Sequence, residues 1–144
     1  MVIRINKRIK KGEILTILIF SLIFAALLPY FAKIPLAVAM HKAGGYDNHH
    51  PRDQQAQFKG FGARALAAHQ NGFESLIVFA AAILLAIATD TTNETVQLVA
   101  MTHIGFRVTY HIFYLLNKDI LRSLSWAIAI GCSFVIMGLC ISAL

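Results

Sequence analysis

Apolar side chains fill four long stretches of this chain, and short polar segments separate them. A helix needs about 20 mainly apolar residues to cross a bilayer, with a range of roughly 17–25. In lipid, backbone polar groups are satisfied only within helices or closed barrels, and these stretches are too long for barrel strands. The pattern therefore predicts an all-α, four-helix transmembrane bundle, with helices at about residues 14–40, 53–89, 94–116 and 119–143.

A basic segment, residues 1–13, precedes the first apolar stretch, so that residues 14–144 form the predicted membrane domain. A basic segment before an apolar run is also the pattern of a signal peptide, and Ala37-Val38-Ala39 resembles a cleavage site. That site lies well beyond an apolar run that is already long enough to span a bilayer before Pro29. This length favours an uncleaved spanning helix. The cations of the segment are Arg4, Lys7, Arg8, Lys10 and Lys11.

The connections between the stretches differ in length. Thr91 and Glu94 have the spacing of a capping box and predict a helix start with Thr91 as the N-cap. Residues 117–119 form a turn so short that the third and fourth helices are expected to be antiparallel neighbours. The connector at residues 41–62 is longer, and either Pro51 or Asp53 within it is the expected start of a helix that projects beyond the membrane.

Composition supports a membrane protein. The 144 residues are 58% hydrophobic and 14% charged, and the mean hydropathy is +0.66. Soluble domains average about 45–50% apolar and about 25% charged residues, so a soluble enzyme and a disordered chain are both excluded. Basic residues give a net charge of +6, and at membrane edges they do not indicate nucleic-acid binding. Cys132 and Cys140 lie about 12 Å apart along one helix, so we expect packing roles and no disulfide.

The third apolar stretch carries a polar stripe about 100° wide at helical spacing. Each ionisable group at membrane depth costs about 2.5–3.5 kcal/mol on insertion scales, so such a stripe faces protein or water. Interhelical hydrogen bonding is one explanation, although one or two polar residues would suffice for it. A ligand site is the other. The stripe consists of His103, Arg107, Tyr110, His111 and Tyr114.

Two other segments add polar groups. Arg64, Asn71 and Glu74 share one face of the second helix, whereas His69 points to another side. Arg122 and Ser123 open the last helix. Structural pairing of Arg64 and Glu74 with other helices and snorkelling of Arg122 are the simple interpretations. The functional interpretation is a site for a zwitterionic peptide with a second carboxylate, such as glutathione, whose thiol pKa an arginine would lower below about 8.5.

Four segments resemble the MAPEG family, the membrane-associated proteins of eicosanoid and glutathione metabolism. Residues 64–74 resemble the family's second-helix motif with its N-x-x-E spacing, and residues 107–114 resemble its R-x-x-Y-x-x-x-Y pattern. Residues 121–123 resemble the start of its fourth helix, and residues 45–52 resemble a connector of bacterial members. The resemblance covers about residues 41–126.

The resemblance implies a homotrimer in the lipid bilayer that binds glutathione between subunits. It implies a glutathione S-transferase or peroxidase acting on lipophilic electrophiles, in a multi-pass protein of the bacterial inner membrane. Arg122 would stabilise the glutathione thiolate, with Ser123 as a hydrogen-bond donor. The implied glutathione-binding residues are Arg64, Asn71, Glu74, Arg107, Tyr110 and Tyr114.

The chain also departs from the family pattern, because Ala67 stands where the glutathione enzymes have arginine and Ser75 where they often have tyrosine. These departures motivate an alternative: a non-catalytic membrane protein that keeps the fold without glutathione chemistry.

Two further alternatives rest on single residue types. Histidines on helices suggest a haem or electron-carrier bundle, and Glu74 suggests a proton-coupled exporter. No cluster has the spacing of metal ligands, so we predict no metal site. The histidines concerned are His69, His103 and His111.

Overall fold

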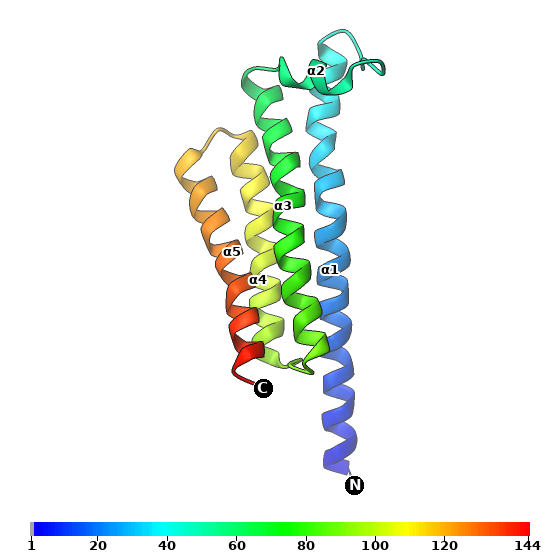
Figure 1. Cartoon of the computed structure of the whole chain (residues 1–144), viewed down its shortest axis with the longest axis vertical. Coiled ribbons are helices and arrows are strands. Elements are labelled where there is room, and N and C mark those ends of the chain that lie inside the picture. The colour runs from blue at the N-terminus through cyan, green and yellow to red at the C-terminus, as the bar shows by residue number, and fades with distance from the viewer. Residues whose placement is uncertain (1) are drawn as a thin grey trace.

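The computed structural model describes residues 2–144, with side chains from residue 9 onward, and this part of the chain contains helices and no strand (Figure 1). Four helices are long and one is short. In chain order they are α1 (Val2–Lys42), α2 (Pro51–Ala56), α3 (Gly60–Ala88), α4 (Glu94–Leu115) and α5 (Asp119–Ile141).

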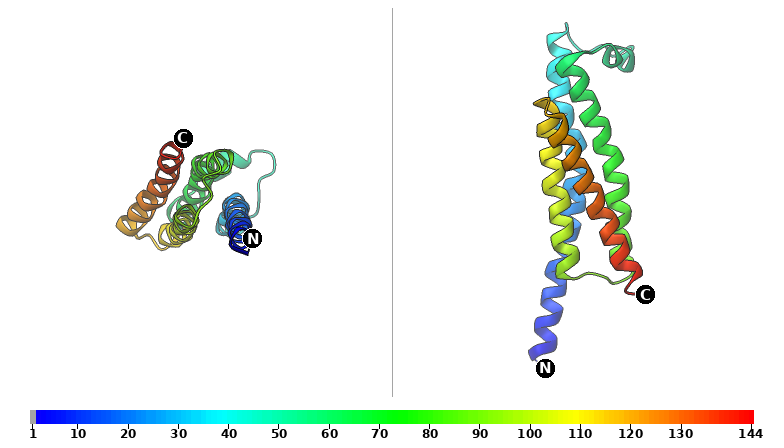
Figure 2. Two further views of the ribbon diagram at one scale, coloured as in Figure 1. Left: turned by 90° about the horizontal axis from the view of Figure 1, so that it is seen from below. Right: turned by 90° about the vertical axis from the view of Figure 1, so that its left-hand side faces the viewer.

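The long helices pack into one bundle with α3 near its centre. Helix α1 packs along α3, α4 packs along α5, and α3 contacts all the other long helices. The end-on view of Figure 2 shows α1 and α5 on opposite sides of the bundle. Helices α4 and α5 run antiparallel on either side of the turn at residues 116–118, as the short connection predicts.

By length and composition, three helices of the described chain qualify as membrane spans. They are residues 9–42 of α1, together with α3 and α5. Helix α4 has 22 residues, which is a comparable length. Its polar stripe, which includes the buried side chains of His103, Arg107 and His111, lowers its mean hydropathy. These three helices are therefore candidates for the membrane spans predicted from the apolar pattern.

Helix α1 begins at Val2, so it starts earlier than the predicted start at about residue 14 and includes the basic segment from residue 2 onward. Lysine and arginine are good helix formers, and an apolar helix that is already nucleated propagates through them. Lys10 forms an ion pair with Glu94, and Lys11 lies 2.6 Å from the carboxylate of Asp90. These contacts fasten α1 to the connection between α3 and α4. Met1 and the side chains of Arg4, Lys7 and Arg8 lie outside the described residues.

The predicted second helix, residues 53–89, is in fact two helices. Residues 57–59 are not helical, and α3 starts at Gly60 with a φ of +57°, a left-handed conformation that favours glycine. The side chain of Phe58 fills the space beside Gly62, where an added Cβ would lie 2.9 Å from the ring. Packing of this aromatic side chain redirects the chain where sequence periodicity indicated a continuous helix.

The N-cap of α4 lies two residues after Thr91, the predicted N-cap. The N-cap of α4 is Asn93, whose side chain accepts a hydrogen bond of 3.0 Å from the backbone N–H of Val96. The hydroxyl of Thr91 instead pairs with that of Thr89 at 2.8 Å. Asp90 adopts a φ of +56°, which ends α3 in a tight turn and moves the start of α4 beyond Thr91.

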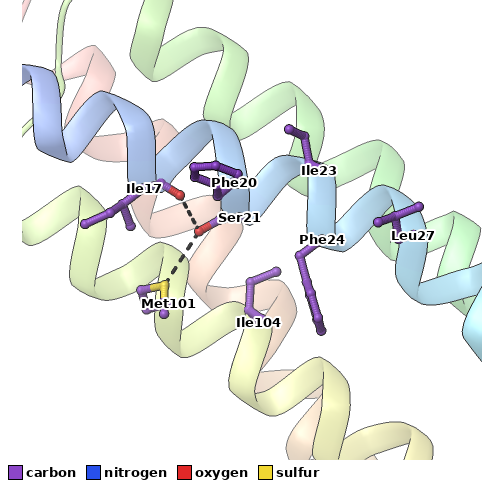
Figure 3. A pocket seen from close by; sticks show the side chains of 8 residues that line it. All are labelled: Ile17, Phe20, Ser21, Ile23, Phe24, Leu27, Met101 and Ile104. Carbon is purple, nitrogen blue, oxygen red and sulfur yellow. Dashed lines mark hydrogen bonds between the residues drawn. The ribbon is translucent and has the colours of Figure 1, made fainter.

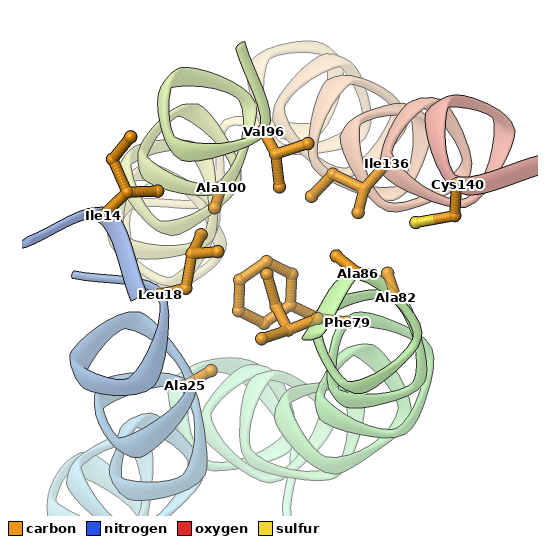
Figure 4. Close-up of a cluster of buried hydrophobic side chains, with 11 residues drawn as sticks. Ile14, Leu18, Ala25, Phe79, Ala82, Ala86, Val96, Ala100, Ile136 and Cys140 are labelled. Carbon is orange, nitrogen blue, oxygen red and sulfur yellow. The ribbon is translucent and has the colours of Figure 1, made fainter. Parts of the chain in front are cut away.

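A buried apolar cluster joins α1, α3, α4 and α5 at the end of the bundle that holds the C-terminus (Figure 4). Phe79 lies at its centre and is surrounded by small side chains such as Ala86 and Ala100, which allow the helices to approach closely. Cys132 and Cys140 are both free, as predicted. Cys140 belongs to this cluster, which agrees with the packing role expected for it.

Helices α1 and α3 approach each other closely at Pro29 and Gly72. A Cβ added to Gly72 would lie 3.2 Å from the backbone Cα of Pro29. We expect Gly72→Ala to lower the free energy of unfolding by about 1–3 kcal/mol, because overpacking forces the two helices apart. Thermal unfolding in detergent, followed by circular dichroism, measures this loss.

Gly131→Ala is the matched control, since a Cβ there meets nothing within 4 Å. This control should keep or slightly raise stability, because alanine favours a helix over glycine by about 1 kcal/mol. Equal stability of the two variants would contradict a tight crossing at Gly72.

Candidate functional site

The centre of the polar stripe is Arg107 on α4, which is 2% exposed. Its guanidinium donates hydrogen bonds of 3.1 Å to both the side-chain oxygen and the backbone oxygen of Asn71 on α3. The Asn71 amide group donates in turn to the carboxylate of Glu74, at 2.7 Å. Arg107 therefore orients the Asn71 amide, and this amide orients Glu74, which lies exposed on the surface of the bundle.

Two arginines and two tyrosines form a second part of the site. The Arg107 guanidinium carbon lies 4.4 Å from the centre of the Tyr110 ring. The guanidinium carbon of Arg122, from α5, lies 4.5 Å from the centre of the Tyr114 ring. The two tyrosine rings meet edge to face at 5.4 Å. These cation–π contacts fix each guanidinium over an aromatic face.

Two cavities open beside these groups. One has a volume of about 420 Å³, within the range of small-molecule sites. The other is about 200 Å³ and includes Glu74 and Arg107. Asn71 and Trp126 line both cavities, so the two form adjacent compartments of one site. The larger compartment is lined by Asn71, Tyr110, Tyr114, Arg122, Ser123, Trp126 and Ala127.

A groove between α1 and α4 is larger, about 610 Å³, but it has a different character (Figure 3). Its lining is apolar except for Ser21, whose hydroxyl donates to the backbone oxygen of Ile17. This groove has no ionisable group in its lining and suits an acyl chain of the bilayer. The ionisable residues of the polar stripe therefore lie outside this groove.

Most of the predicted site residues converge on the two compartments, but Arg64 does not. It lines neither cavity, and its Nε is buried without a hydrogen-bond partner in the described structure. Arg64 lies two helical turns before Asn71, closer to the N-terminal end of α3. The residues that do line the compartments are Asn71, Glu74, Arg107, Tyr110, Tyr114, Arg122 and Ser123.

The three histidines of α3 and α4 contact backbone oxygens of different helices. Nδ1 of His103 lies 2.8 Å from the backbone oxygen of Ala129 on α5, and its ring stacks on Phe79 at 4.0 Å. Nδ1 of His69 lies 2.8 Å from the backbone oxygen of Pro29 on α1. His111 contacts its own helix, at the backbone oxygen of Arg107. A carbonyl can only accept, so each Nδ1 carries the proton. His69 therefore links α3 to α1, and His103 links α4 to α5.

Trp126 is an aromatic site residue that the sequence analysis missed, as it missed the apolar lining residues Val78, Ala127 and Ile130. It lies one helical turn after Arg122 on α5, so the two side chains share a face of that helix. This i, i+4 spacing was available in the sequence. On α5 the predicted site included only the charged Arg122 and the hydroxyl-bearing Ser123, and not the side chains one turn further along the helix.

Comparison with family models found one match, to the model described as the MAPEG family, over residues 17–142. The chain belongs to the MAPEG family. The match includes every residue of the two compartments, and it confirms the resemblance found in the helix motifs. Searches of curated proteins and of solved structures found no match.

Proposed function

We propose that this MAPEG protein binds glutathione in the two compartments and transfers it to lipophilic electrophiles, or uses it to reduce lipophilic peroxides. The observation that supports this most directly is the hydrogen-bonded series Arg107–Asn71–Glu74, which shares a wall with the compartment of Arg122. Glutathione needs a carboxylate for its ammonium group, cations for its carboxylates and a cation for its thiolate. Glu74 would meet the ammonium group, Arg122 would meet the thiolate, and Arg107 at the wall of the smaller compartment would supply positive charge for one carboxylate.

The chemical step would use Arg122 and Ser123 in the larger compartment. A thiolate held by the Arg122 guanidinium attacks the electrophilic carbon, forms the S–C bond and expels the leaving group with its electron pair. The thiol proton leaves to water. Ser123 is exposed at the same wall and would donate its hydroxyl proton as a hydrogen bond to the thiolate. Electrophiles dissolved in the bilayer would reach this compartment directly.

The proposal includes four membrane-crossing helices and a homotrimer. Helix α4 is antiparallel to α5 and beside α3, both of which qualify as spans, so it would cross with them. Glu74 is exposed on the single chain although α3 qualifies as a span. An ionised side chain facing lipid costs about 2.5–3.5 kcal/mol. A neighbouring copy that covers the open site would remove this cost. The connector resemblance favours the inner membrane of a bacterium.

The alternative is a non-catalytic protein with the same fold. It is favoured by two residues that depart from the glutathione enzymes of the family. Ala67 lacks the positive charge of the arginine at that position, and Ser75, which is buried, has a hydroxyl where those enzymes often have a tyrosine ring. A protein of this kind would keep the Arg107–Asn71 contact as a purely structural link between α3 and α4. Glutathione binding separates the two functions.

The test is calorimetric titration of the detergent-purified protein with glutathione. Saturable binding is expected, and Glu74→Gln should weaken it tenfold or more, because a hydrogen bond to a charged group contributes about 1.5–3 kcal/mol. Glu13→Gln is the matched control, since Glu13 is exposed on α1 and lines neither compartment, and should bind like the wild type.

A folded protein without binding up to about 10 mM, where the binding free energy would fall below about 3 kcal/mol, would favour the non-catalytic alternative. Equal weakening by Glu74→Gln and Glu13→Gln would show that Glu74 does not contact the ligand.

A further inference from the structure

The apolar groove between α1 and α4 shares no residue with the two compartments of the candidate site (Figure 3). Its lining on α1 extends from Ile17 to Leu27, and ten residues of helix rise about 15 Å. Among the described residues that line it, Ser21 alone is polar, and its hydroxyl donates to the backbone oxygen of Ile17. The groove therefore offers an occupant apolar contact and no hydrogen bond.

The connection between α3 and α4 indicates where the surface of the bilayer lies beside this groove. Residues 89–94 are all polar, and they follow a helix that qualifies as a membrane span. Lys10 and Lys11 of α1 pair with the two carboxylates of this segment. The groove begins at Ile17, about two turns further along α1. Since half of a hydrocarbon core is about 15 Å thick, the groove has the length and the depth of one leaflet.

A polar cavity of about 520 Å³ lies at the level of that connection. Lys10, Lys11, Asp90 and Glu94 contribute charged groups to its lining. Its apolar lining residue on α1 lies one turn before the first residue of the groove. The polar cavity and the apolar groove therefore follow one another along α1, with the polar part at the bilayer surface. A phospholipid has its headgroup and its acyl chain in the same order.

Cations outnumber carboxylates near the polar cavity. Residues 2–13 form the first turns of α1 and contain five cations and one carboxylate, Glu13. Asp90 and Glu94 add two carboxylates. Figure 1 shows this part of α1 extending beyond the other long helices. An excess of positive charge at the level of the headgroups attracts anionic lipids in preference to neutral ones.

We propose that the groove between α1 and α4 and the basic start of α1 form a binding site for an anionic phospholipid. One acyl chain lies in the groove, and the headgroup phosphate lies at the polar cavity beside Lys10 and Lys11. Both lysines are exposed, and an ammonium group has three donors, so each can bind phosphate while keeping its carboxylate partner. The site does not depend on glutathione binding.

Charge also argues against a second copy of the chain in this groove. A copy in the same orientation would bring its own basic segment to the same level of the bilayer, where like charges repel. An anionic lipid brings the opposite charge and leaves the apolar lining of the groove covered.

The first test uses quenching of tryptophan fluorescence by phospholipids with brominated acyl chains, which reports the lipid that touches one side chain. The variant Trp126→Phe, Phe20→Trp has its only tryptophan in the groove, where Phe20 is 65% exposed. The full chain is placed in phosphatidylcholine bilayers with increasing fractions of brominated phosphatidylglycerol. We expect the anionic lipid to bind at position 20 about three- to tenfold more strongly than phosphatidylcholine.

The matched control has Phe134→Trp in place of Phe20→Trp. Phe134 lies on α5, is 60% exposed and does not line the groove. The neighbouring Ser133 contacts His103 of α4. Ser21, which follows position 20, contacts Met101 on the same turn of α4, so both fluorophores lie at nearly the same depth. The two lipids should bind equally at position 134, because the basic segment belongs to α1.

The second test removes charge from the groove reporter. Lys10→Gln, Lys11→Gln should lower the preference for phosphatidylglycerol about threefold or more. Lys42→Gln, Lys118→Gln removes the same charge from two exposed lysines, one at the opposite end of α1 and one before α5, and should keep the preference. Circular dichroism should show the same helix content in both, since exposed ion pairs contribute little to stability.

Each outcome supports or overturns the lipid site. An equal preference at positions 20 and 134 would overturn it, because the anionic lipid would then gather around the whole protein. A preference that survives Lys10→Gln, Lys11→Gln would overturn the headgroup site. Weak quenching at position 20 by brominated forms of both lipids would overturn the proposal in favour of a second copy that covers the groove. A preference that is confined to position 20 and lost with the two lysines would support it.

Discussion

Arg107→Met is expected to lower the free energy of unfolding by about 2–3 kcal/mol and to weaken glutathione binding at least tenfold. The substitution removes the donors to both oxygens of Asn71, and a hydrogen bond to a charged group contributes about 1.5–3 kcal/mol. The variant also no longer has to bury a charged group, which is unfavourable in the wild type. This gain offsets part of the loss, so the expected fall in the free energy of unfolding is smaller than the sum of the two hydrogen bonds. Methionine preserves much of the apolar stem, so the effect reports the guanidinium.

The measurement is unfolding in detergent followed by circular dichroism, together with the glutathione titration. Arg107→Lys should be intermediate, since one ammonium group cannot reproduce the fork that reaches both oxygens of Asn71. Arg52→Met is the control, because Arg52 is exposed on α2 and lines neither compartment. If Arg107→Met were as stable as Arg52→Met, the link between α3 and α4 would not depend on this contact.

Much of the fold could be predicted from the apolar stretches and the lengths of the connections between them. Long apolar stretches predict helices, because lipid leaves the backbone no other partner. The short turn at residues 117–119 predicts the pairing of α4 with α5. The exact helix ends are decided by interactions between segments. Lys10 and Lys11 contact residues near the start of α4, and the left-handed Asp90 displaces the cap from Thr91 to Asn93. No local pattern contains those contacts.

The site shows the same division. Periodicity placed Asn71 and Glu74 on one face and Arg107, Tyr110 and Tyr114 on another, and the structure brings them together. Periodicity could not assign members of one stripe to different neighbours. His103 and Arg107 are one turn apart on α4, yet the hydrogen bond of the first goes to α5 and the hydrogen bonds of the second go to α3. A stripe about 100° wide touches two helices, and only packing decides which residue meets which.

The second large effect concerns Arg122. Arg122→Ala is expected to lower the turnover of an electrophile by about 10²–10³, the loss usual when a preorganised donor to a developing or stored negative charge is removed. The folded bundle should survive, since Arg122 lies near the start of α5, half-buried, and loses only its contact with Tyr114. That contact contributes about 0.5–1 kcal/mol at a site of this exposure.

Turnover should be compared with the ultraviolet absorbance of the bound thiolate in the same samples. If Arg122 acts by stabilising the thiolate, both quantities fall together in Arg122→Ala, and Arg122→Lys restores part of each, because it keeps a positive charge without the planar fork. Ser123→Ala should cost less, since a hydroxyl adds one neutral hydrogen bond of about 0.5–1.5 kcal/mol. Unchanged turnover in Arg122→Ala would contradict this role. A fall in turnover with an undiminished thiolate would instead make Arg122 a group that contacts the electrophile.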